Sequence, residues 1–155
     1  MHPHVRRHLL GDLRRVLLSS VSSDAHTWNL VYLQLLIEEL GPEVVNLGAC
    51  VPDALLISEA LRVQPDLIVL STVNGHGYGD GKRVITALRA HRALRDLPVV
   101  IGGKLGVGGP ISDTQTDDLL AAGFDAVFGD DAAPESFRRF LDRLVPSPTG
   151  GECVP

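Results

Sequence analysis

The sequence predicts an α/β fold in which five parallel strands form one central sheet, covered by helices on both faces in three α/β/α layers. Three observations support this prediction. Five short apolar segments alternate along the chain with longer segments whose apolar residues repeat at helical spacing. Most of the short segments are apolar throughout, which is typical of strands buried on both faces of a parallel sheet. The length of 155 residues suits a single domain.

The expected strands are short and separated from one another by helical segments. They cover residues 16–21, 44–47, 67–70, 99–101 and 126–128. Each connection between them is expected to be a right-handed crossover, which makes neighbouring strands parallel. The resulting open, doubly wound sheet is of the flavodoxin-like or Rossmann-like type. In such sheets ligands bind beyond the carboxyl ends of the strands.

The first two expected helices are bounded by residues that start or stop helices. The first covers residues 30–40 and ends at Gly41 and Pro42, because neither residue readily continues a helix. The second begins at Pro52, which suits a helix start, and ends near Val63. These boundaries place the loops that follow the first two strands.

Three more helices complete the alternation. Residues 82–92 have apolar side chains on one face and Lys or Arg on the other. Thr114 and Asp117 have the spacing of a capping box ahead of a fourth helix, which Gly123 ends. The last helix begins at Pro134, a residue suited to a first helical turn.

One domain with two short terminal segments is expected. An N-terminal extension covers residues 1–13, the domain covers 14–145, and a flexible tail covers 146–155. The basic N-terminus lacks the apolar stretch and cleavage site of a secretory signal. No apolar run approaches the ~20 residues that cross a bilayer. We therefore expect a cytoplasmic protein with no membrane role.

Charge and cysteine content argue against two classes of function. Fourteen Lys and Arg against nineteen Asp and Glu give a net charge of −5, which disfavours nucleic-acid binding. Cys50 and Cys153 are far apart in the sequence and lack the spacing of a zinc site or a disulfide framework. Any metal would have to be held in another way.

The loop after the first strand carries an acid, Asp24, and an imidazole, His26, at the edge where ligands are expected. A neutral imidazole binds transition metals, and a carboxylate that accepts its other N–H fixes its tautomer and orientation. The alternative is that Asp24 caps the following helix and His26 is an ordinary loop residue. Trp28 either packs beside a ligand or anchors the first helix against the sheet.

Two further loops at the same edge are rich in glycine. Residues 71–81 contain four glycines but neither a P-loop nor a GxGxxG pattern, so a nucleotide site lacks its specific signature and a flexible connection is the alternative. Residues 102–109 contain five glycines, more than one turn requires. Backbone without side chains would let a bulky ligand pass close by.

Taken together, the residues at the ends of strands one, three and four resemble the cobalamin-binding fingerprint DxHxxG, SxL, GG. Asp24 and His26 match its first part, Ser71 its second, and Gly102 and Gly103 its third. Residues 16–144 are most similar to the small subunit of glutamate mutase (methylaspartate mutase). The likeness is carried by SDAH at 23–26, VVNLG at 44–48, NGHG at 74–77 in place of Tyr-Gly-Gln-Gly, VIGG at 100–103 and AGFD at 122–125.

The resemblance implies a corrinoid bound with its own benzimidazole base displaced, so that His26 is the lower axial ligand of the cobalt and Asp24 orients it. The displaced nucleotide tail would lie between the sheet and the first helix. No catalytic residue is implied, and His26 is the one metal ligand. The residues implied in cofactor binding are Ser23, Asp24, Ala25, His26, Thr27, Ser71, Thr72, Val73, Gly102, Gly103, Lys104, Leu105, Gly106 and Val107.

In this family the cofactor is adenosylcobalamin, and a larger barrel-type mutase subunit holds the amino-acid substrate over its upper face. The resemblance therefore implies the cobalamin-binding component of a glutamate-mutase-type carbon-skeleton isomerase, which is inactive alone. In such an enzyme the cofactor performs the radical chemistry, while this subunit supplies axial ligation and orientation.

Two residues depart from the fingerprint. Asn29 replaces the last Gly of DxHxxG, and Val73 replaces the Leu of SxL. Asparagine tolerates a left-handed backbone and caps helices, so Asn29 is expected to preserve the local loop geometry. Val73 is shorter than Leu but still apolar, and it would form an apolar wall beside the tail.

The sequence leaves two other functions open. A stand-alone corrinoid-binding module could serve a methyltransferase, a regulator or a specialised biosynthetic enzyme. Methyl-transfer modules usually carry a helical domain before the sheet, for which about a dozen residues leave no room. A phosphoacceptor receiver shares the sheet but needs an Asp at the end of the third strand, where this chain has Ser71. We therefore favour the mutase component.

Overall fold

A parallel sheet forms the centre of the structure, a computed structural model that describes residues 13–130 and 134–145. Its five strands lie in the order β2-β1-β3-β4-β5, and every neighbouring pair is parallel. The strands are β1 (Arg15–Ser19), β2 (Glu43–Asn46), β3 (Leu67–Thr72), β4 (Val99–Gly103) and β5 (Ala126–Phe128). The predicted doubly wound α/β class is confirmed.

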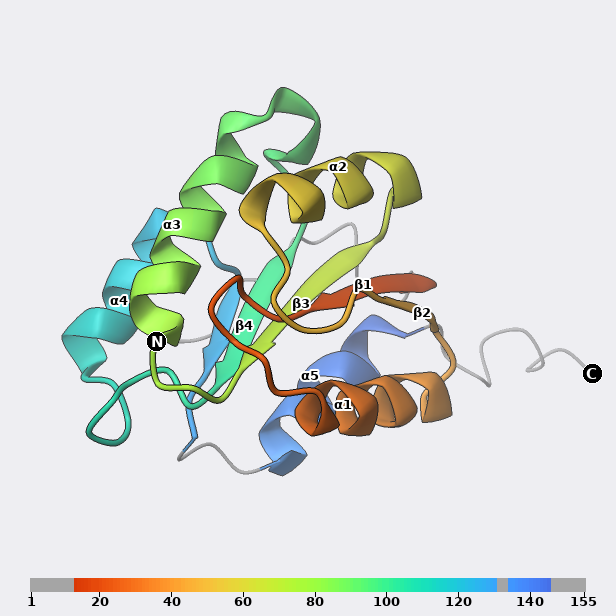
Figure 1. Ribbon diagram of the computed structural model, residues 1–155. Coiled ribbons are helices and arrows are strands. Elements are labelled where there is room, and N and C mark those ends of the chain that lie inside the picture. The colour runs from red at the N-terminus through yellow and green to blue at the C-terminus, as the bar shows by residue number, and fades with distance from the viewer. Residues whose placement is uncertain (1–12, 131–133, 146–155) are drawn as a thin grey trace, which may run out of the picture.

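Helices cover both faces of the sheet and complete the three layers (Figure 1). Helices α1 (Trp28–Glu39) and α5 (Pro134–Leu144) lie on one face, and α2 (Asp53–Val63), α3 (Gly77–Ala90) and α4 (Asp113–Ala122) lie on the other, with a short 3-10 helix (Arg92–Leu94) after α3. None of the described helices combines the length and apolarity needed to cross a bilayer. The expected extension and tail lie outside the described residues, apart from residue 13.

The sheet separates two apolar cores. Along β1, Val16 and Leu18 pack into the core formed with α1 and α5, whereas Leu17 packs into the core formed with α2, α3 and α4. This alternation follows from the two-residue period of a strand. Because helices cover both faces, every position of such a strand is buried, which explains the continuous apolar runs in the sequence.

Helix α3 begins earlier than predicted, at Gly77 rather than at residue 82. The prediction placed this segment in a loop because glycine weakens a helix. A Cβ on Gly77 would lie 2.5 Å from the Leu105 side chain and 2.6 Å from that of Thr72, and a Cβ on Gly81 would lie 2.7 Å from Ile101. The first turns of α3 approach the sheet too closely for any larger residue at these two positions.

Helix α4 is capped by a different pair of residues from the predicted one. The Ser112 side chain accepts the backbone N–H of Gln115 over 3.1 Å, and the Gln115 side chain accepts the N–H of Ser112 over 3.1 Å. Thr114 lies inside the helix, so it lacks the extended backbone that an N-cap residue such as Ser112 adopts. Gly123 ends the helix as predicted.

Two boundaries near the candidate site also differ from the prediction. Helix α1 begins at Trp28 instead of residue 30, and β1 ends at Ser19 instead of residue 21. The strand ends early because the backbone N–H of Ser20 donates to the Gly48 carbonyl, beyond the last residue of β2. The loop between β1 and α1 therefore spans residues 20–27 at the carboxyl edge of the sheet.

Candidate functional site

Asp24 is fully buried at the carboxyl edge of the sheet, in the loop between β1 and α1. Its Oδ1 lies 2.6 Å from Nδ1 of His26 and accepts the backbone N–H of His26 over 2.9 Å. Its Oδ2 accepts the Thr72 hydroxyl over 2.6 Å and the backbone N–H of Val73 over 2.7 Å. The N-cap of α1 is Thr27, so the alternative in which Asp24 caps this helix is excluded.

The hydrogen bonds to Asp24 determine its ionisation. Burial raises the pKa of this carboxyl, but hydrogen bonds from Thr72, from the backbone N–H groups of His26 and Val73 and from the His26 ring outweigh that effect and lower it to about 2. The carboxylate is therefore charged at neutral pH and accepts the Nδ1 proton of His26. In the tautomer that this bond selects, the lone pair of the ring is on Nε2.

The two members of this pair differ sharply in exposure. The Asp24 side chain is 0% exposed, whereas the His26 side chain is 62% exposed. A buried group thus fixes the tautomer of a ring that remains accessible. This arrangement suits the ligation of a metal by Nε2, because Asp24 binds the other ring nitrogen, Nδ1, and so orients the ring.

Thr72 holds Asp24 in place. It ends β3, is 0% exposed, and donates its hydroxyl to the carboxylate. The sequence prediction included Thr72 among the residues that contact the cofactor, and the structure places it behind Asp24. The preceding residue of the same strand, Ser71, is 5% exposed and lines an apolar pocket.

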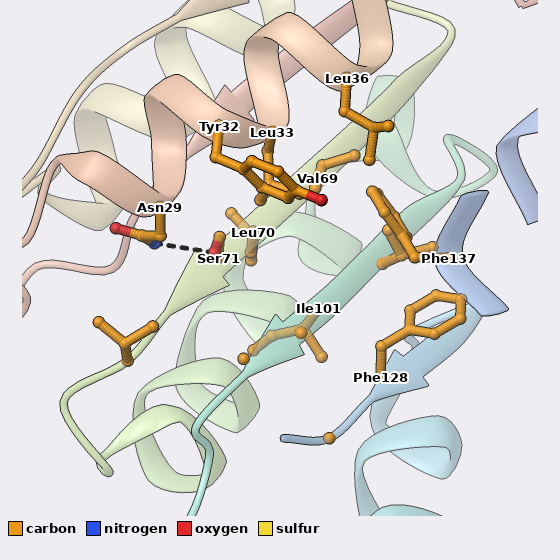
Figure 2. Close-up of a pocket in the computed structure, with 15 residues that line it drawn as sticks. Asn29, Tyr32, Leu33, Leu36, Val69, Leu70, Ser71, Ile101, Phe128 and Phe137 are labelled. Atoms are coloured by element: carbon orange, nitrogen blue, oxygen red, sulfur yellow. Dashed lines mark hydrogen bonds between the residues drawn. The ribbon is translucent and has the colours of Figure 1, made fainter. Parts of the chain in front are cut away.

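The apolar pocket lies between α1 and the sheet (Figure 2). It has a volume of about 240 Å³, enough for a flat bicyclic ring but far too little for a whole corrin. Its apolar walls come from α1, from β3 to β5 and from Phe137 of α5, and Asn29, Tyr32 and Ser71 supply its polar side-chain atoms. The residues lining it are Asn29, Tyr32, Leu33, Leu36, Val69, Leu70, Ser71, Val73, Val100, Ile101, Gly102, Gly103, Phe128, Gly129 and Phe137.

Four predicted site residues line this pocket: Ser71, Val73, Gly102 and Gly103. Close packing between strands also requires glycine at positions 102 and 103. A Cβ on Gly103, whose φ is +111°, would lie 2.0 Å from the Thr72 carbonyl oxygen, and one on Gly102 would lie 3.0 Å from the Phe128 carbonyl oxygen. The glycine pair therefore lets the strands pack as well as leaving the pocket open.

The predicted loop residues 104–107 lie apart from this pocket. Leu105 is buried in the core under α3, and Val107 is 75% exposed. Leu105, Gly106 and Val107 border a second, more polar hollow together with His76 and Asp80. The backbone of Lys104 pairs with Thr72 and Gly75, which fixes this loop against the end of β3.

The remaining predicted residues, Ser23, Ala25 and Thr27, are exposed beside His26. Ser23 donates its hydroxyl to Asp80 and accepts the Asn74 amide N–H over 2.9 Å. These contacts tie the His26 loop to α3. Trp28 is 83% exposed, so it does not anchor α1 against the sheet.

Sequence reasoning missed most of the pocket wall. Phe128 and Phe137 pack edge to face with ring centroids 5.3 Å apart, and with Tyr32 they give the pocket an aromatic boundary. The one available signal was the apolar character of α1 on every side. Asn29 is neither left-handed nor the N-cap of α1, and its amide instead donates to Ser71 Oγ over 2.9 Å.

The carboxylate-oriented imidazole and the apolar pocket both lie toward the carboxyl ends of the strands, where open α/β sheets bind their ligands, and such an imidazole suits a metal. The family model described as B12 binding domain matches residues 14–136, and the chain belongs to this family.

Known proteins similar to this chain include a glutamate mutase component. The glutamate mutase sigma subunit 2 of Haloarcula marismortui is 31% identical over 123 residues, which cover 79% of this chain and 82% of that protein. The HTH-type transcriptional repressor CarA of Myxococcus xanthus is 35% identical over 89 residues, covering 57% of this chain and 30% of the repressor.

A solved structure supports the fold. The cobalamin-binding protein from Desulfitobacterium hafniense superimposes with a TM-score of 0.69 at 23% identity, over 86% of this chain and 60% of that one. The chain thus corresponds to somewhat more than half of that structure. At this identity the likeness concerns the arrangement of strands and helices.

The described residues fit a cobalamin. No group of three or more His, Cys, Asp or Glu in residues 13–130 and 134–145 could hold a bare metal ion, whereas a cobalt already held in a corrin needs one further protein atom. Nε2 of His26 is such an atom. In the pocket wall, the Ser71 hydroxyl lies among apolar side chains, which suits a flat aromatic base with a single hydrogen-bonding atom.

Proposed function

We propose that this protein is the cobalamin-binding component of a glutamate-mutase-type carbon-skeleton isomerase, inactive without a larger catalytic subunit. In this proposal His26 is the lower axial ligand of the cobalt, and the base of the cofactor lies in the apolar pocket. The observation that supports it best is the Asp24–His26 pair, because a buried carboxylate that accepts the Nδ1 hydrogen leaves Nε2 as the ring atom available to a metal, in a side chain that is exposed.

The chain's own residues bind and orient the cofactor. Asp24 holds the Nδ1 proton of His26, while Thr72 and Val73 hold Asp24. The pocket supplies apolar contacts to a flat base, and the Ser71 hydroxyl supplies a hydrogen bond. Adenosylcobalamin, when bound, supplies the radical chemistry of such enzymes. Ser23, Ala25 and Thr27, which are exposed beside His26, would lie against a bound corrin.

The substrate is assigned to a separate, barrel-type subunit. The described residues form one sheet with its helices, and in this proposal the apolar pocket beneath α1 holds the base of the cofactor, not a substrate. The match to a sigma subunit over 82% of its length supports this division of roles. The exposed edge around His26 is where the larger subunit would cover the upper face of the corrin.

Electron paramagnetic resonance of bound cob(II)alamin tests the axial ligand. In protein labelled with ¹⁵N-histidine, we expect the nitrogen splitting of the cobalt signal to change from three lines to two, because the ligand nitrogen comes from His26. His26→Ala should lose this splitting, while His91→Ala, at the end of α3, should keep it. If the splitting stays at three lines in the ¹⁵N-labelled protein, the assignment of His26 as the ligand is wrong.

Catalysis is tested by adding a large glutamate mutase subunit and adenosylcobalamin and measuring the interconversion of glutamate and 3-methylaspartate. Turnover that requires both proteins supports the proposal. The similarity to CarA favours one alternative, a regulatory corrinoid-binding module. Tight corrinoid binding without turnover with the large subunit would support that alternative instead.

A further inference from the structure

The polar end of the apolar pocket consists of two side chains that bond to each other. Asn29, in the first turn of α1, donates its amide N–H to Ser71 Oγ at the end of β3 over 2.9 Å. Figure 2 shows this bond bridging the helix and the strand that face each other across the pocket. Whatever enters the pocket therefore meets a hydroxyl that is already engaged.

The direction of this bond determines what Ser71 can offer a ligand. A hydroxyl has one hydrogen to donate and can accept on its oxygen. Because Ser71 Oγ accepts the hydrogen bond from Asn29, the Ser71 hydroxyl hydrogen is not used in that bond. The hydroxyl donates to no other residue that the structure describes. Ser71 thus presents a donor to the pocket.

The Asn29 side chain makes no other hydrogen bond within the described structure. Its Oδ1 is buried and unpaired, which is unfavourable for a polar atom. Its backbone conformation does not require asparagine, because it is an ordinary position within α1. The one hydrogen bond that the Asn29 side chain makes is therefore the one to Ser71. Stability alone does not account for an asparagine at this position.

We propose that Asn29 is a positioning residue that sets the hydrogen-bonding polarity of the pocket and so selects the lower base of the corrinoid. This inference rests on the proposed function. By holding Ser71 as a donor, Asn29 favours bases with an unprotonated ring nitrogen, such as benzimidazoles and purines. It disfavours phenolic bases, which have no ring nitrogen to accept the hydrogen bond.

Three corrinoids separate this selection from binding in general. Cobalamin carries a benzimidazole, p-cresolylcobamide carries a phenolic base, and cobinamide lacks the nucleotide tail. Cobalamin alone must also release its base from cobalt, a cost that is the same in every variant. We therefore expect loss of the Ser71 donor to lower the ratio of cobalamin affinity to p-cresolylcobamide affinity about three- to tenfold, the value of one net hydrogen bond. The dissociation constants are measured by titration of the corrin absorption.

Asn29→Asp is the most informative variant, because aspartate has the same shape as asparagine but would accept a hydrogen bond from Ser71 instead of donating one. A carboxylate accepts but does not donate, so Ser71 must turn its hydrogen toward residue 29 and away from the pocket. The ratio of cobalamin affinity to p-cresolylcobamide affinity should fall by that factor, while cobinamide binding stays as in the wild type. The added charge acts equally on cobalamin and p-cresolylcobamide, since both carry the same phosphate.

Ser71→Ala completes the test. If Asn29 acts through Ser71, adding Asn29→Asp to Ser71→Ala should cause no further change in the preference. A wild-type preference that survives in Asn29→Asp, or a further change in the Ser71→Ala background, would overturn the inference. Failure of all three corrinoids to bind the wild type would instead overturn the proposed function, and this inference with it.

Discussion

The Thr72 hydroxyl donates to Oδ2 of Asp24 over 2.6 Å, while Oδ1 of the same carboxylate lies 2.6 Å from Nδ1 of His26. The residue that ends β3 therefore controls the orientation of an imidazole that it does not touch. Because Thr72 and Asp24 are both fully buried, the orientation of His26 is determined inside the protein and not by solvent.

Replacing Thr72 tests this relationship. Thr72→Val keeps the shape but removes the donor, so we expect the pKa of Asp24 to rise and His26 to be less well oriented. Removing a direct hydrogen-bond partner of a metal-ligating histidine typically costs about 10- to 100-fold in metal affinity. Because Thr72 acts on His26 only through Asp24, we expect cobinamide to bind more weakly by about tenfold at most. Thr72→Ser, which keeps the hydroxyl, is the control. Equal affinity in Thr72→Val and Thr72→Ser would contradict the role given to this hydroxyl.

The buried Asp24 carboxylate should make stability depend on pH. Its pKa is about 2 in the folded chain against an ordinary 3.8. Because the folded pKa is the lower one, the stabilisation is present above the ordinary value and is lost as the pH falls through the folded value. Between neutral pH and the folded pKa, urea unfolding should show the wild type losing roughly 2 kcal/mol relative to Asp24→Asn. A difference that stays constant with pH would refute this prediction.

Arg83 should stabilise the loop that carries His26. It contacts Asp53 of α2 over 2.8 Å, Asp80 over 2.7 Å and the Ser22 hydroxyl over 3.2 Å. Since the Arg83 side chain is 47% exposed, Arg83→Met should lower the free energy of unfolding by only ~1 kcal/mol, and by less at high salt.

Hydrogen exchange provides the more specific measurement for Arg83→Met. Amides 22–27 should exchange faster in this variant than in the wild type. Arg62→Met is the matched control, because Arg62 pairs with Glu59 within the single helix α2 and is remote from the loop. Equal exchange rates for these amides in the two variants would show that Arg83 does not hold the loop.

Gly103→Ala should strongly destabilise the fold. Gly103 has φ +111°, and an added Cβ would lie 2.0 Å from the Thr72 carbonyl oxygen, so the end of β4 would have to move away from β3. We expect a loss of about 3 kcal/mol or more in chemical unfolding. Gly108→Ala, where an added Cβ meets no atom within 4 Å, should be nearly neutral. Similar losses in both variants would contradict this account.

The sheet could be predicted from the sequence because its strands are buried on both faces. Runs such as 67–70 are apolar at every position, and few other structures produce that pattern. The start of α3 was missed because glycine propensity argues against a helix, whereas the close approach of Gly77 to Leu105 and Thr72 decides the outcome. Contacts across the fold outweighed local preference there.

The candidate site was predictable to a similar, partial extent. Asp24 and His26 are two residues apart, so their pairing has a local signal in the sequence. Phe128 and Phe137 reach the pocket from β5 and α5, about a hundred residues after Asn29, and no spacing rule links them to it. The contact of Asn29 with Ser71 was missed for the same reason, because it depends on how α1 lies over β3.

The separation of the two cores by the sheet assigns different tasks to its two sides. On the side of α2, α3 and α4, the helices pack directly on the strands through contacts such as that of Gly77 with Thr72. The layer of α1 and α5 keeps a slot open against the same strands. The same five strands therefore serve as the floor of a solid core on one face and of a ring-sized opening on the other.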